Sequence, residues 1–158
     1  MTTTRVIIGA DVAGFDLKEA VKAHLIQKRY DIVDVGMTEK EQTIPFQEVG
    51  FRVGRAVSKG EFERGLLFCG SGMGIHLAAA KFPGVLCAVC ESVPAAKRCV
   101  IANRCNILAM GGFYVAPYTG CQMAEEFLSS NFGDGQTERF VAFHEKAYQD
   151  IMNNAYQE

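Results

Sequence analysis

The sequence predicts an α/β fold in which helices cover both faces of a five-stranded parallel sheet, a three-layer arrangement of the Rossmann-like type. Short apolar runs alternate along the 158 residues with longer segments whose apolar residues recur every three or four positions. This is the pattern of alternating strands and helices. The short runs are apolar throughout, which is typical of strands buried on both faces. A doubly wound sheet of this kind favours the strand order 2-1-3-4-5.

The first half of the chain is expected to contain two strands and two helices. Residues 5–9 and 32–35 are short apolar runs and are expected to be strands. Residues 15–28 and 46–59 are expected to be helices, because apolar residues stand four positions apart in each. These residues are Leu17, Val21 and Leu25, and then Val49, Val53 and Val57. The polar segment 37–45 is expected to be a loop.

The second half continues the alternation. Strands are expected at residues 66–68, 85–90 and 107–110. Helices are expected at residues 75–81, from Ser92 onward, at 117–129 and at 137–156. Ser92 is a good N-cap residue, and Pro94 suits a first helical turn. The pair Gly111-Gly112 is expected to end the fifth strand.

Length and composition indicate one domain over residues 1–158, because 49% hydrophobic content is enough for a core at this length. A net charge of −2 without a basic stripe argues against a nucleic-acid partner. The apolar runs are too short to span a membrane. The chain passes directly into a strand, so no signal peptide is expected. Its six cysteines are therefore expected to be reduced thiols in the cytoplasm.

Cys87 and Cys90 have the CxxC spacing of some redox and metal sites. They lie within an expected strand, where residues three apart face opposite sides of the sheet. A redox CxxC needs a helix start, and a zinc site needs a second pair of ligands. Both cysteines are therefore expected to be core residues, and no metal site is expected.

A thiol stands on a glycine-rich turn between the third strand and the third helix. The turn reads Cys69-Gly70-Ser71-Gly72-Met73-Gly74, and its glycines allow backbone N–H groups to converge on an anion. The start of a helix also favours a thiolate, which makes the cysteine a better base or nucleophile. The alternative is a tight turn with an inert cysteine at its edge.

An acidic residue is expected beside this thiol. In a doubly wound sheet the first and third strands are neighbours, and ligands bind at their carboxyl ends. The first strand leads into Gly9-Ala10-Asp11, and the third ends at Cys69. Asp11 and Cys69 are therefore predicted to lie next to each other in the binding site.

Three segments, from Ile8 to Lys18, from Phe68 to Val85 and from Asn103 to Gly111, carry a family resemblance. They resemble the family that contains ribose-5-phosphate isomerase type B and the galactose-6-phosphate isomerase subunits. The most specific part is the glycine loop with its cysteine, followed by Ala79-Ala80-Lys81-Phe82-Pro83-Gly84.

The resemblance implies an aldose–ketose isomerase for a sugar phosphate of the ribose 5-phosphate/ribulose 5-phosphate type. Such an enzyme moves a proton between neighbouring carbons through a cis-enediolate and uses no metal or organic cofactor. The resemblance implies Cys69 as the base, Ser71 as a proton relay and Asp11 as the acid that binds sugar hydroxyls. The implied substrate-binding residues are Gly70, Gly72, Met73, Gly74, Asn103, Arg104 and Arg139.

The resemblance also implies a homodimer or homotetramer, because family sites form between two subunits. Residues 132–158 are expected to be a helical segment at the subunit interface. Four phenylalanines near the C-terminus fit either an interface or a core: Phe127, Phe132, Phe140 and Phe143. Phosphate contacts are expected from one or more of Lys97, Arg98, Arg104 and Arg139.

Four positions depart from the family pattern. Val12 and Ala102 stand where ribose-phosphate members usually have histidine. Gln136 and Phe140 stand where the family usually has arginines that bind the phosphate. The chain therefore lacks some of the side chains with which family members are expected to open a sugar ring and bind a phosphate.

A four-carbon substrate is consistent with the missing histidines. A tetrose 4-phosphate cannot close to a furanose, because its O4 is esterified, so its isomerase needs no ring-opening acid. Tetrose/tetrulose 4-phosphate isomerase is therefore one alternative function. Among the histidines present, His24 and His144 are expected at the surface, and His76 is expected to pack against a neighbour.

Two further alternatives remain open. One is a paralogue or subunit that binds a sugar phosphate without catalysis, or that acts on an unphosphorylated sugar. The other is a dinucleotide-binding oxidoreductase, because Gly70-x-Gly72 opens a suitable turn and Glu91 follows about twenty residues on. Against it, Ile75 stands where the third glycine belongs.

Overall fold

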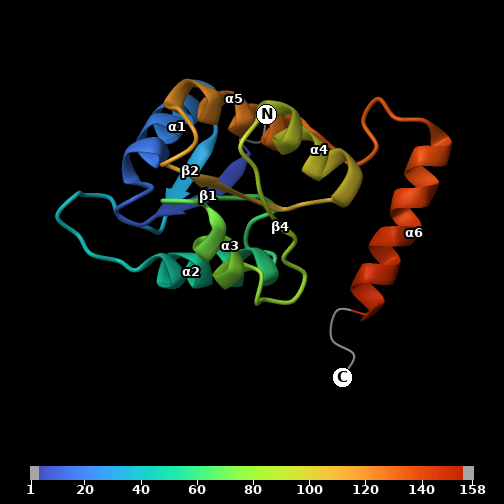
Figure 1. Cartoon of the computed structure of the whole chain (residues 1–158), viewed down its shortest axis with the longest axis horizontal. Helices are drawn as coiled ribbons and strands as arrows, with labels where there is room; N and C mark the ends of the chain where they lie inside the picture. Colours follow the sequence, from blue (N-terminus) through green and yellow to red (C-terminus); the bar gives the residue numbers. More distant parts are fainter. Residues whose placement is uncertain (1–3, 155–158) are drawn as a thin grey trace.

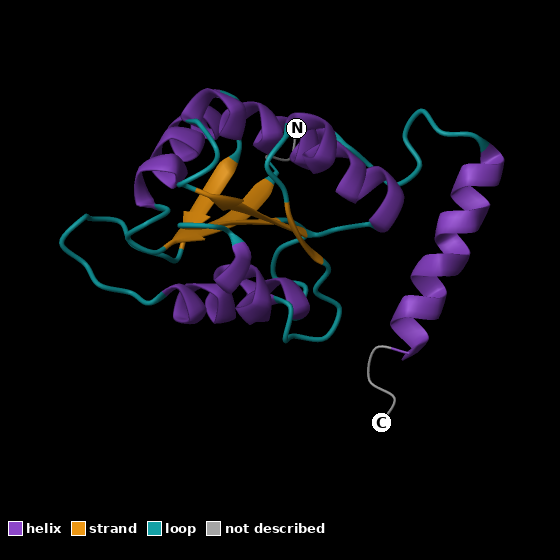
Figure 2. Cartoon of the chain, viewed as in Figure 1, coloured by secondary structure: helices purple, strands orange, loops and turns teal. Residues whose placement is uncertain are grey.

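The computed structural model describes residues 4–154, which form the expected three-layer α/β fold (Figures 1 and 2). The parallel strands are β1 (Arg5–Ala10), β2 (Asp31–Asp34), β3 (Gly65–Cys69), β4 (Cys87–Val89) and β5 (Ile107–Gly111). The helices are α1 (Phe15–Gln27), α2 (Phe46–Ser58), α3 (Met73–Ala79), α4 (Val93–Asn103), α5 (Pro117–Ser129) and α6 (Glu138–Asn154). The predicted elements are confirmed with shifts of at most two residues at their described ends. The expected end of the last helix, residue 156, lies outside the described residues.

The strand order is β2-β1-β3-β5-β4, so the predicted order 2-1-3-4-5 is wrong at its last two strands. Burial explains the difference. Every residue of β5 is buried, whereas β4 has three residues that are all half-buried. The longer and more apolar strand therefore takes the covered position beside β3, and β4 forms the edge of the sheet.

Helices cover the two faces of the sheet unequally. Figure 2 shows α1, α4 and α5 over one face and α2 with α3 over the other. Side chains of alternate strand residues pack into two separate cores, with Leu66 and Phe68 toward the first and Leu67 and Cys69 toward the second. Cys69 therefore points to the side of the sheet that α2 and α3 cover. None of the helices within residues 4–154 is long and apolar enough to cross a bilayer.

A buried ion pair joins α1 to the carboxyl end of β2. The side chain of Lys18 is fully buried, and its Nζ donates to Asp34 Oδ2 and to the carbonyl oxygen of Met37, both over 2.6 Å. Lys22 Nζ reaches the same carboxylate oxygen over 2.9 Å. Both lysines also pair with Glu19 Oε1, so two cations compensate the buried carboxylate of Asp34 and the more exposed one of Glu19. This cluster fixes the start of α1 near the end of the sheet where Asp11 lies.

The last helix, α6, stands beside the layers rather than on them (Figure 1). It has no buried residue, although it is 17 residues long. Of the phenylalanines near the C-terminus, Phe127 belongs to the core, whereas Phe143 on α6 is 68% exposed.

Candidate active site

The carboxyl ends of β1 and β3 bring Asp11 and Cys69 together, as the sequence predicts. The two strands pair in parallel, with Ala10 opposite Phe68. Asp11 directly follows Ala10, and Cys69 directly follows Phe68. The N–H of Asp11 donates to the carbonyl oxygen of Phe68 over 3.3 Å. Asp11 and Cys69 thus share one edge of the sheet, at the place where a doubly wound fold binds ligands.

The Cys69 loop, defined here as residues 69–74, holds the thiol against a backbone donor. Cys69 is 5% exposed, and its Sγ accepts the N–H of Gly72 over 3.1 Å. Ser71 Oγ accepts the N–H of Met73 over 3.2 Å. The N–H groups of Gly72 and Met73 are therefore already hydrogen-bonded within the loop. The other amides of the loop would donate to an oxyanion.

A tight turn fixes the carboxylate of Asp11. Its Oδ1 accepts the N–H groups of Ala13 and Gly14, each over 3.0 Å. Gly14 lies directly on the Phe68–Cys69 backbone, since a Cβ there would come within 2.3 Å of the Phe68 carbonyl carbon. The turn after β1 and the Cys69 loop therefore pack as one unit.

The segment after β5 supports the Cys69 loop from the other side. The N–H of Gly112 donates to the carbonyl oxygen of Cys69 over 2.8 Å, and that of Phe113 donates to Gly70 over 2.9 Å. This contact exists because β5, and not β4, is the neighbour of β3. The strand order thus decides which residues border the loop.

Two aromatic residues at this edge were missed by the sequence analysis. The ring of Phe113 lies against Gly70, and the ring of Phe46 lies against Gly74. The corrected strand order would have placed Phe113 beside the loop, because it follows β5 closely. No comparable signal exists for Phe46, whose position depends on how the long 37–45 segment folds back to α2.

A single chain does not bring Asn103 or Arg104 to Cys69, and Arg139 lies on α6, which stands beside the layers (Figure 1). Helix α4 starts from the carboxyl end of β4 and runs to the amino end of β5, about 16 Å for its 11 residues. Asn103 is its last residue, so it lies at the opposite edge of the sheet from Cys69. Arg104 lines a shallow cavity there with Glu63 and Arg64, which precede β3.

Arg104 is occupied by the C-terminal segment. Its guanidinium pairs with Glu145 on α6 and lies over the rings of Phe132 and Tyr148. Hydrogen bonds from Gln149 and Arg104 hold the pKa of Glu145 below its usual value. Within one chain Arg104 therefore fastens α6 to the end of α4, and the predicted role in substrate binding has no support from its contacts in the same chain.

The histidines differ in their surroundings. His76 Nε2 is 3.0 Å from the carbonyl oxygen of Cys87, so it packs against a neighbouring strand as expected. His24, expected at the surface, is half-buried and pairs with Glu125. His144, expected at the surface, is instead half-buried: it stacks on Phe140 and lines a small cavity with Asn103 between α4 and α6.

The CxxC cysteines lie on opposite sides of the sheet, as predicted. Cys87 packs with the α2 and α3 core, and Cys90 belongs to the other core. Burial raises the pKa of the Cys87 thiol well above its ordinary value. Within residues 4–154, no three histidine, cysteine or acidic side chains are placed to hold a metal ion together.

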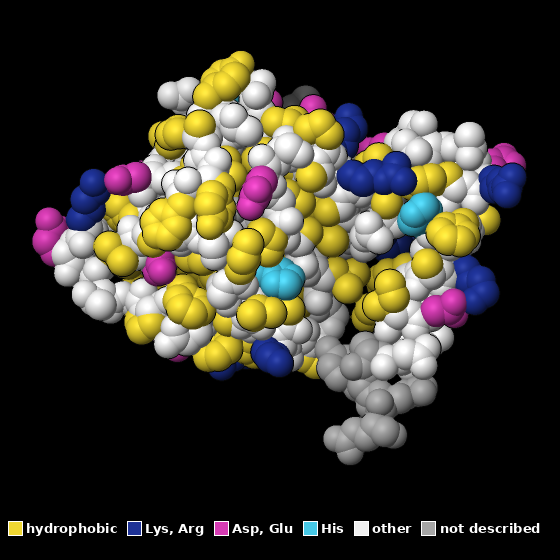
Figure 3. Space-filling view, viewed as in Figure 1, with side chains coloured by type: hydrophobic (Ala, Val, Ile, Leu, Met, Phe, Trp, Pro, Cys, Tyr) yellow, Lys and Arg dark blue, Asp and Glu magenta, His cyan; other side chains and the backbone are white. Residues whose placement is uncertain are grey.

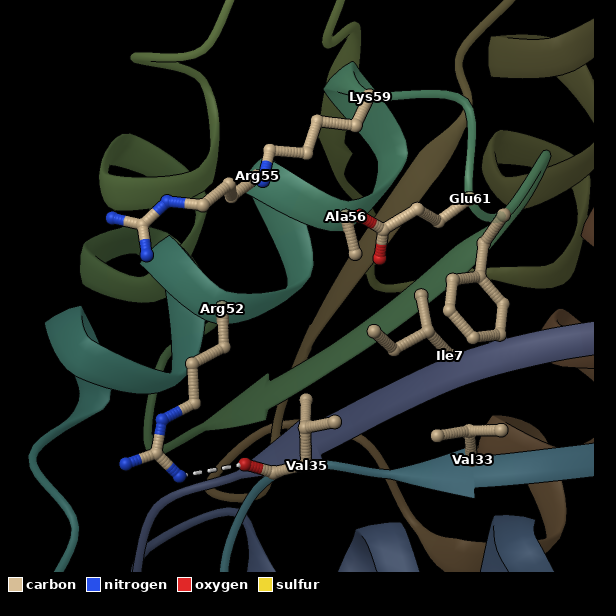
Figure 4. Close-up of a pocket in the computed structure, with 9 residues that line it drawn as sticks. Ile7, Val33, Val35, Arg52, Arg55, Ala56, Lys59 and Glu61 are labelled. Carbon is tan, nitrogen blue, oxygen red and sulfur yellow. Dashed lines mark hydrogen bonds between the residues drawn. The ribbon is translucent and has the colours of Figure 1, made fainter.

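Another cavity lies away from this site, between α2 and β2 (Figure 4). It measures about 390 Å³ and has Ile7, Val33 and Val35 on its strand side. Arg52 donates to the carbonyl oxygen of Val35 over 3.0 Å. In Figure 4, Arg55 points away from these strands, and the cavity lining includes neither Asp11 nor the Cys69 loop.

Comparison with known proteins identifies relatives over most of the chain. A 4-deoxy-4-sulfo-D-erythrose isomerase of Clostridium sp. (strain MSTE9) is 44% identical over 147 residues, which cover 93% of this chain and 92% of that protein. A D-erythrulose-4-phosphate isomerase 2 of Mycolicibacterium smegmatis is 31% identical over 130 residues, 81% of this chain and 86% of that one.

A solved structure shows the same architecture. The ribose-5-phosphate isomerase B of Mycoplasma genitalium with bound ribulose-5-phosphate superimposes with a TM-score of 0.87 at 25% identity, and each chain is covered completely. A family model for ribose/galactose isomerases matches residues 6–143. The chain is therefore an aldose–ketose isomerase and belongs to the ribose/galactose isomerase family.

Proposed function

We propose that this isomerase acts on a four-carbon sugar whose carbon 4 carries an anionic group, with a sulfonate favoured over a phosphate. The observation that carries the proposal is the pairing of Asp11 and Cys69 at one sheet edge without a histidine at position 12 or 102. Proton transfer between carbons of a bound sugar needs Asp11 and Cys69. Ring opening would need an acid or base that these two positions do not supply.

In the proposed reaction Cys69, as thiolate, removes the proton from carbon 2 of the open-chain aldose. The electron pair forms a carbon–carbon double bond, and the carbonyl oxygen on carbon 1 becomes the enediolate oxygen. Loop amides stabilise that charge. Ser71 moves the hydroxyl proton from oxygen 2 to oxygen 1, and Cys69 returns its proton to carbon 1 to give the ketose. Asp11 holds the sugar hydroxyls.

Closure to a furanose is blocked equally in a tetrose 4-phosphate and in a 4-deoxy-4-sulfo tetrose. Neither has a free hydroxyl on carbon 4, so neither aldose closes to a furanose. Val12 is 68% exposed and Ala102 is buried, and neither side chain transfers a proton. A substrate that stays open needs no such transfer.

The charge at the positions expected to bind the anionic group favours the sulfonate. A phosphate monoester carries about −1.5 to −2 charges at neutral pH, whereas a sulfonate carries one. Gln136 and Phe140 occupy positions where the family resemblance implies arginine, and Arg104 is paired with Glu145. Fewer cations suit a smaller charge. The 44% identical relative, a 4-deoxy-4-sulfo-D-erythrose isomerase, supports the same choice.

In a homodimer or homotetramer, a second copy of the chain would bring to Cys69 the predicted site residues that a single chain leaves away from it. Asn103 and Arg139 of a second copy can meet Cys69 only across a subunit interface. Helix α6 has no buried residue and carries the exposed Phe143, which supports an interface role for the segment 132–158. We therefore propose that the chain is a single domain and that the active site forms between two copies of it.

Deuterium incorporation measured by NMR in heavy water tests the function. The substrates are 4-deoxy-4-sulfo-D-erythrose, D-erythrose 4-phosphate and D-ribose 5-phosphate, each with the wild type and with Cys69→Ala. The expected result is Cys69-dependent exchange at carbon 2 of the four-carbon substrates, fastest for the sulfonate. Exchange with D-ribose 5-phosphate alone would overturn the proposed substrate.

Retention of ligand without exchange would favour a non-catalytic binding protein instead. That outcome is measured by calorimetric titration of wild type and Cys69→Ala with the same compounds. A binding protein keeps its affinity in both and exchanges no proton in either.

A further inference from the structure

Two exposed phenyl rings stand at the two ends of the Cys69 loop. A Cβ atom added at Gly70 would lie 2.4 Å from Phe113 Cε2, and one added at Gly74 would lie 2.6 Å from Phe46 Cε2. Phe113 is 73% exposed and Phe46 is 41% exposed. Large apolar side chains are thus left open to solvent where the loop presents its backbone.

Both rings are attached to well-ordered backbone. The N–H of Phe113 donates to the carbonyl oxygen of Gly70 over 2.9 Å, and the amides of Glu48 and Val49 close the first turn of α2 on Pro45 just before Phe46. The Phe113 ring also meets Tyr114 edge-on, with centroids 6.4 Å apart. Each ring therefore lies against the loop, and the backbone that carries it is held by hydrogen bonds.

On the proposed function, a sugar bound at the loop lies near both rings. Its oxygens on carbons 1 and 2 face the loop amides and its reacting carbon faces Cys69, so its remaining carbons extend past a ring. A phenyl ring offers no hydrogen bond to a hydroxyl. An additional CHOH group pressed against it would lose water without gaining a partner.

We propose that Phe113, with Phe46 opposite it, limits the substrate to four carbons. This inference rests on the proposed function, because it names the residues that set chain length in that same site. Phe113 has the larger share, since its ring lies at Gly70, the loop residue next to Cys69. These are specificity residues and take no part in proton transfer.

The test compares two substrates with the same anionic group and different length, D-erythrose 4-phosphate and D-ribose 5-phosphate. The value of kcat/KM for each is measured in the wild type, Phe113→Ala, Phe113→Leu and Phe46→Ala. We expect Phe113→Ala to raise the ratio of five-carbon to four-carbon kcat/KM by about tenfold or more. Phe46→Ala should raise it less, and Phe113→Leu should fall between Phe113→Ala and the wild type.

Tyr118→Ala is the matched control. Tyr118 is 75% exposed at the start of α5, so its removal also deletes an exposed aromatic ring but none that touches the loop. Its ratio should equal that of the wild type. Light scattering on every variant reports whether the oligomer persists.

The outcomes separate this inference from the function on which it rests. An unchanged ratio in Phe113→Ala, with four-carbon turnover by the wild type, overturns the length limit and leaves the function standing. An equal loss on both substrates together with dissociation of the oligomer assigns the ring to subunit packing and also overturns it. A wild type that turns over only D-ribose 5-phosphate overturns both.

Discussion

Gly72 fixes the donor that faces the thiol. Its φ of 78° lies in the left-handed region, and its N–H donates to Cys69 Sγ. A Cβ at this position would also come within 3.0 Å of the carbonyl carbon of Met110 on β5. The geometry of the Cys69 loop therefore depends on a residue without a side chain.

Gly72→Ala is expected to lower the free energy of unfolding by about 2 kcal/mol and to reduce kcat. About 1 kcal/mol comes from the left-handed backbone, and the rest comes from the contact with Met110. Urea unfolding and steady-state kinetics measure the two effects.

Gly60→Ala is the control for this prediction. Gly60 has a φ of 74°, and nothing lies within 4 Å of an added Cβ, so it carries the backbone cost of about 1 kcal/mol alone. It should leave kcat unchanged. Equal losses of stability in the two variants would contradict a separate cost at Met110.

At the scale of residues, the sequence predicted the pair Asp11 and Cys69 because parallel pairing of two strands was enough to place both. Phe46 and Phe113 could not be predicted, because contact between a ring and a glycine depends on how loops fold. Asn103 stands just before the strand expected at 107–110, which indicates the edge opposite Cys69, whereas the position of Arg139 gave no such indication.

At the scale of elements, the link between α1 and β2 depends on the buried cation of Lys18. Lys18 and Lys22 both contact Asp34 Oδ2, but the first side chain is fully buried and the second is 25% exposed. Burial makes the two cations unequal, because water can replace only the second.

Lys18→Met is expected to destabilise the protein by about 3 kcal/mol, because it removes the fully buried cation and leaves the Asp34 carboxylate with Lys22 and the N–H of Gly36 as partners. Lys22→Met, which removes a cation from the same carboxylate, should cost about 1 kcal/mol or less. Chemical denaturation of both variants at neutral pH measures the difference. Similar costs would show that water reaches Asp34 as easily from either side.

The alternation of apolar runs predicted each strand and helix, because burial on both faces leaves a clear pattern. The alternation did not predict the order of the last two strands in the sheet. The order of β4 and β5 depends on a comparison of their lengths and burial, and the expected strand at 85–90 was longer than the three residues that pair. The early start of α3, at Met73 rather than at residue 75, follows from the sharp turn at Gly72.

At the scale of the whole molecule, the two groups of predicted site residues are divided between opposite edges of the sheet. Asp11 and Cys69 lie at the carboxyl edge, and Asn103 lies at the amino edge with Arg104 and α6. The strand pattern implies this division for Asn103, because Asn103 precedes a parallel strand, but it carries no information on how copies of the chain meet.

This division has a consequence for mixtures of defective chains. If each site takes Cys69 from one chain and Asn103 from the other, a dimer of one Cys69→Ala and one Asn103→Ala chain has one doubly damaged site and one intact site. Two inactive preparations, unfolded together in equal amounts and refolded, should therefore regain about a quarter of wild-type activity, since half of the dimers are mixed. Mixed dimers without activity would mean that each chain works alone; recovery would make the pair of chains the smallest unit that can be inactivated by mutation and restored by mixing.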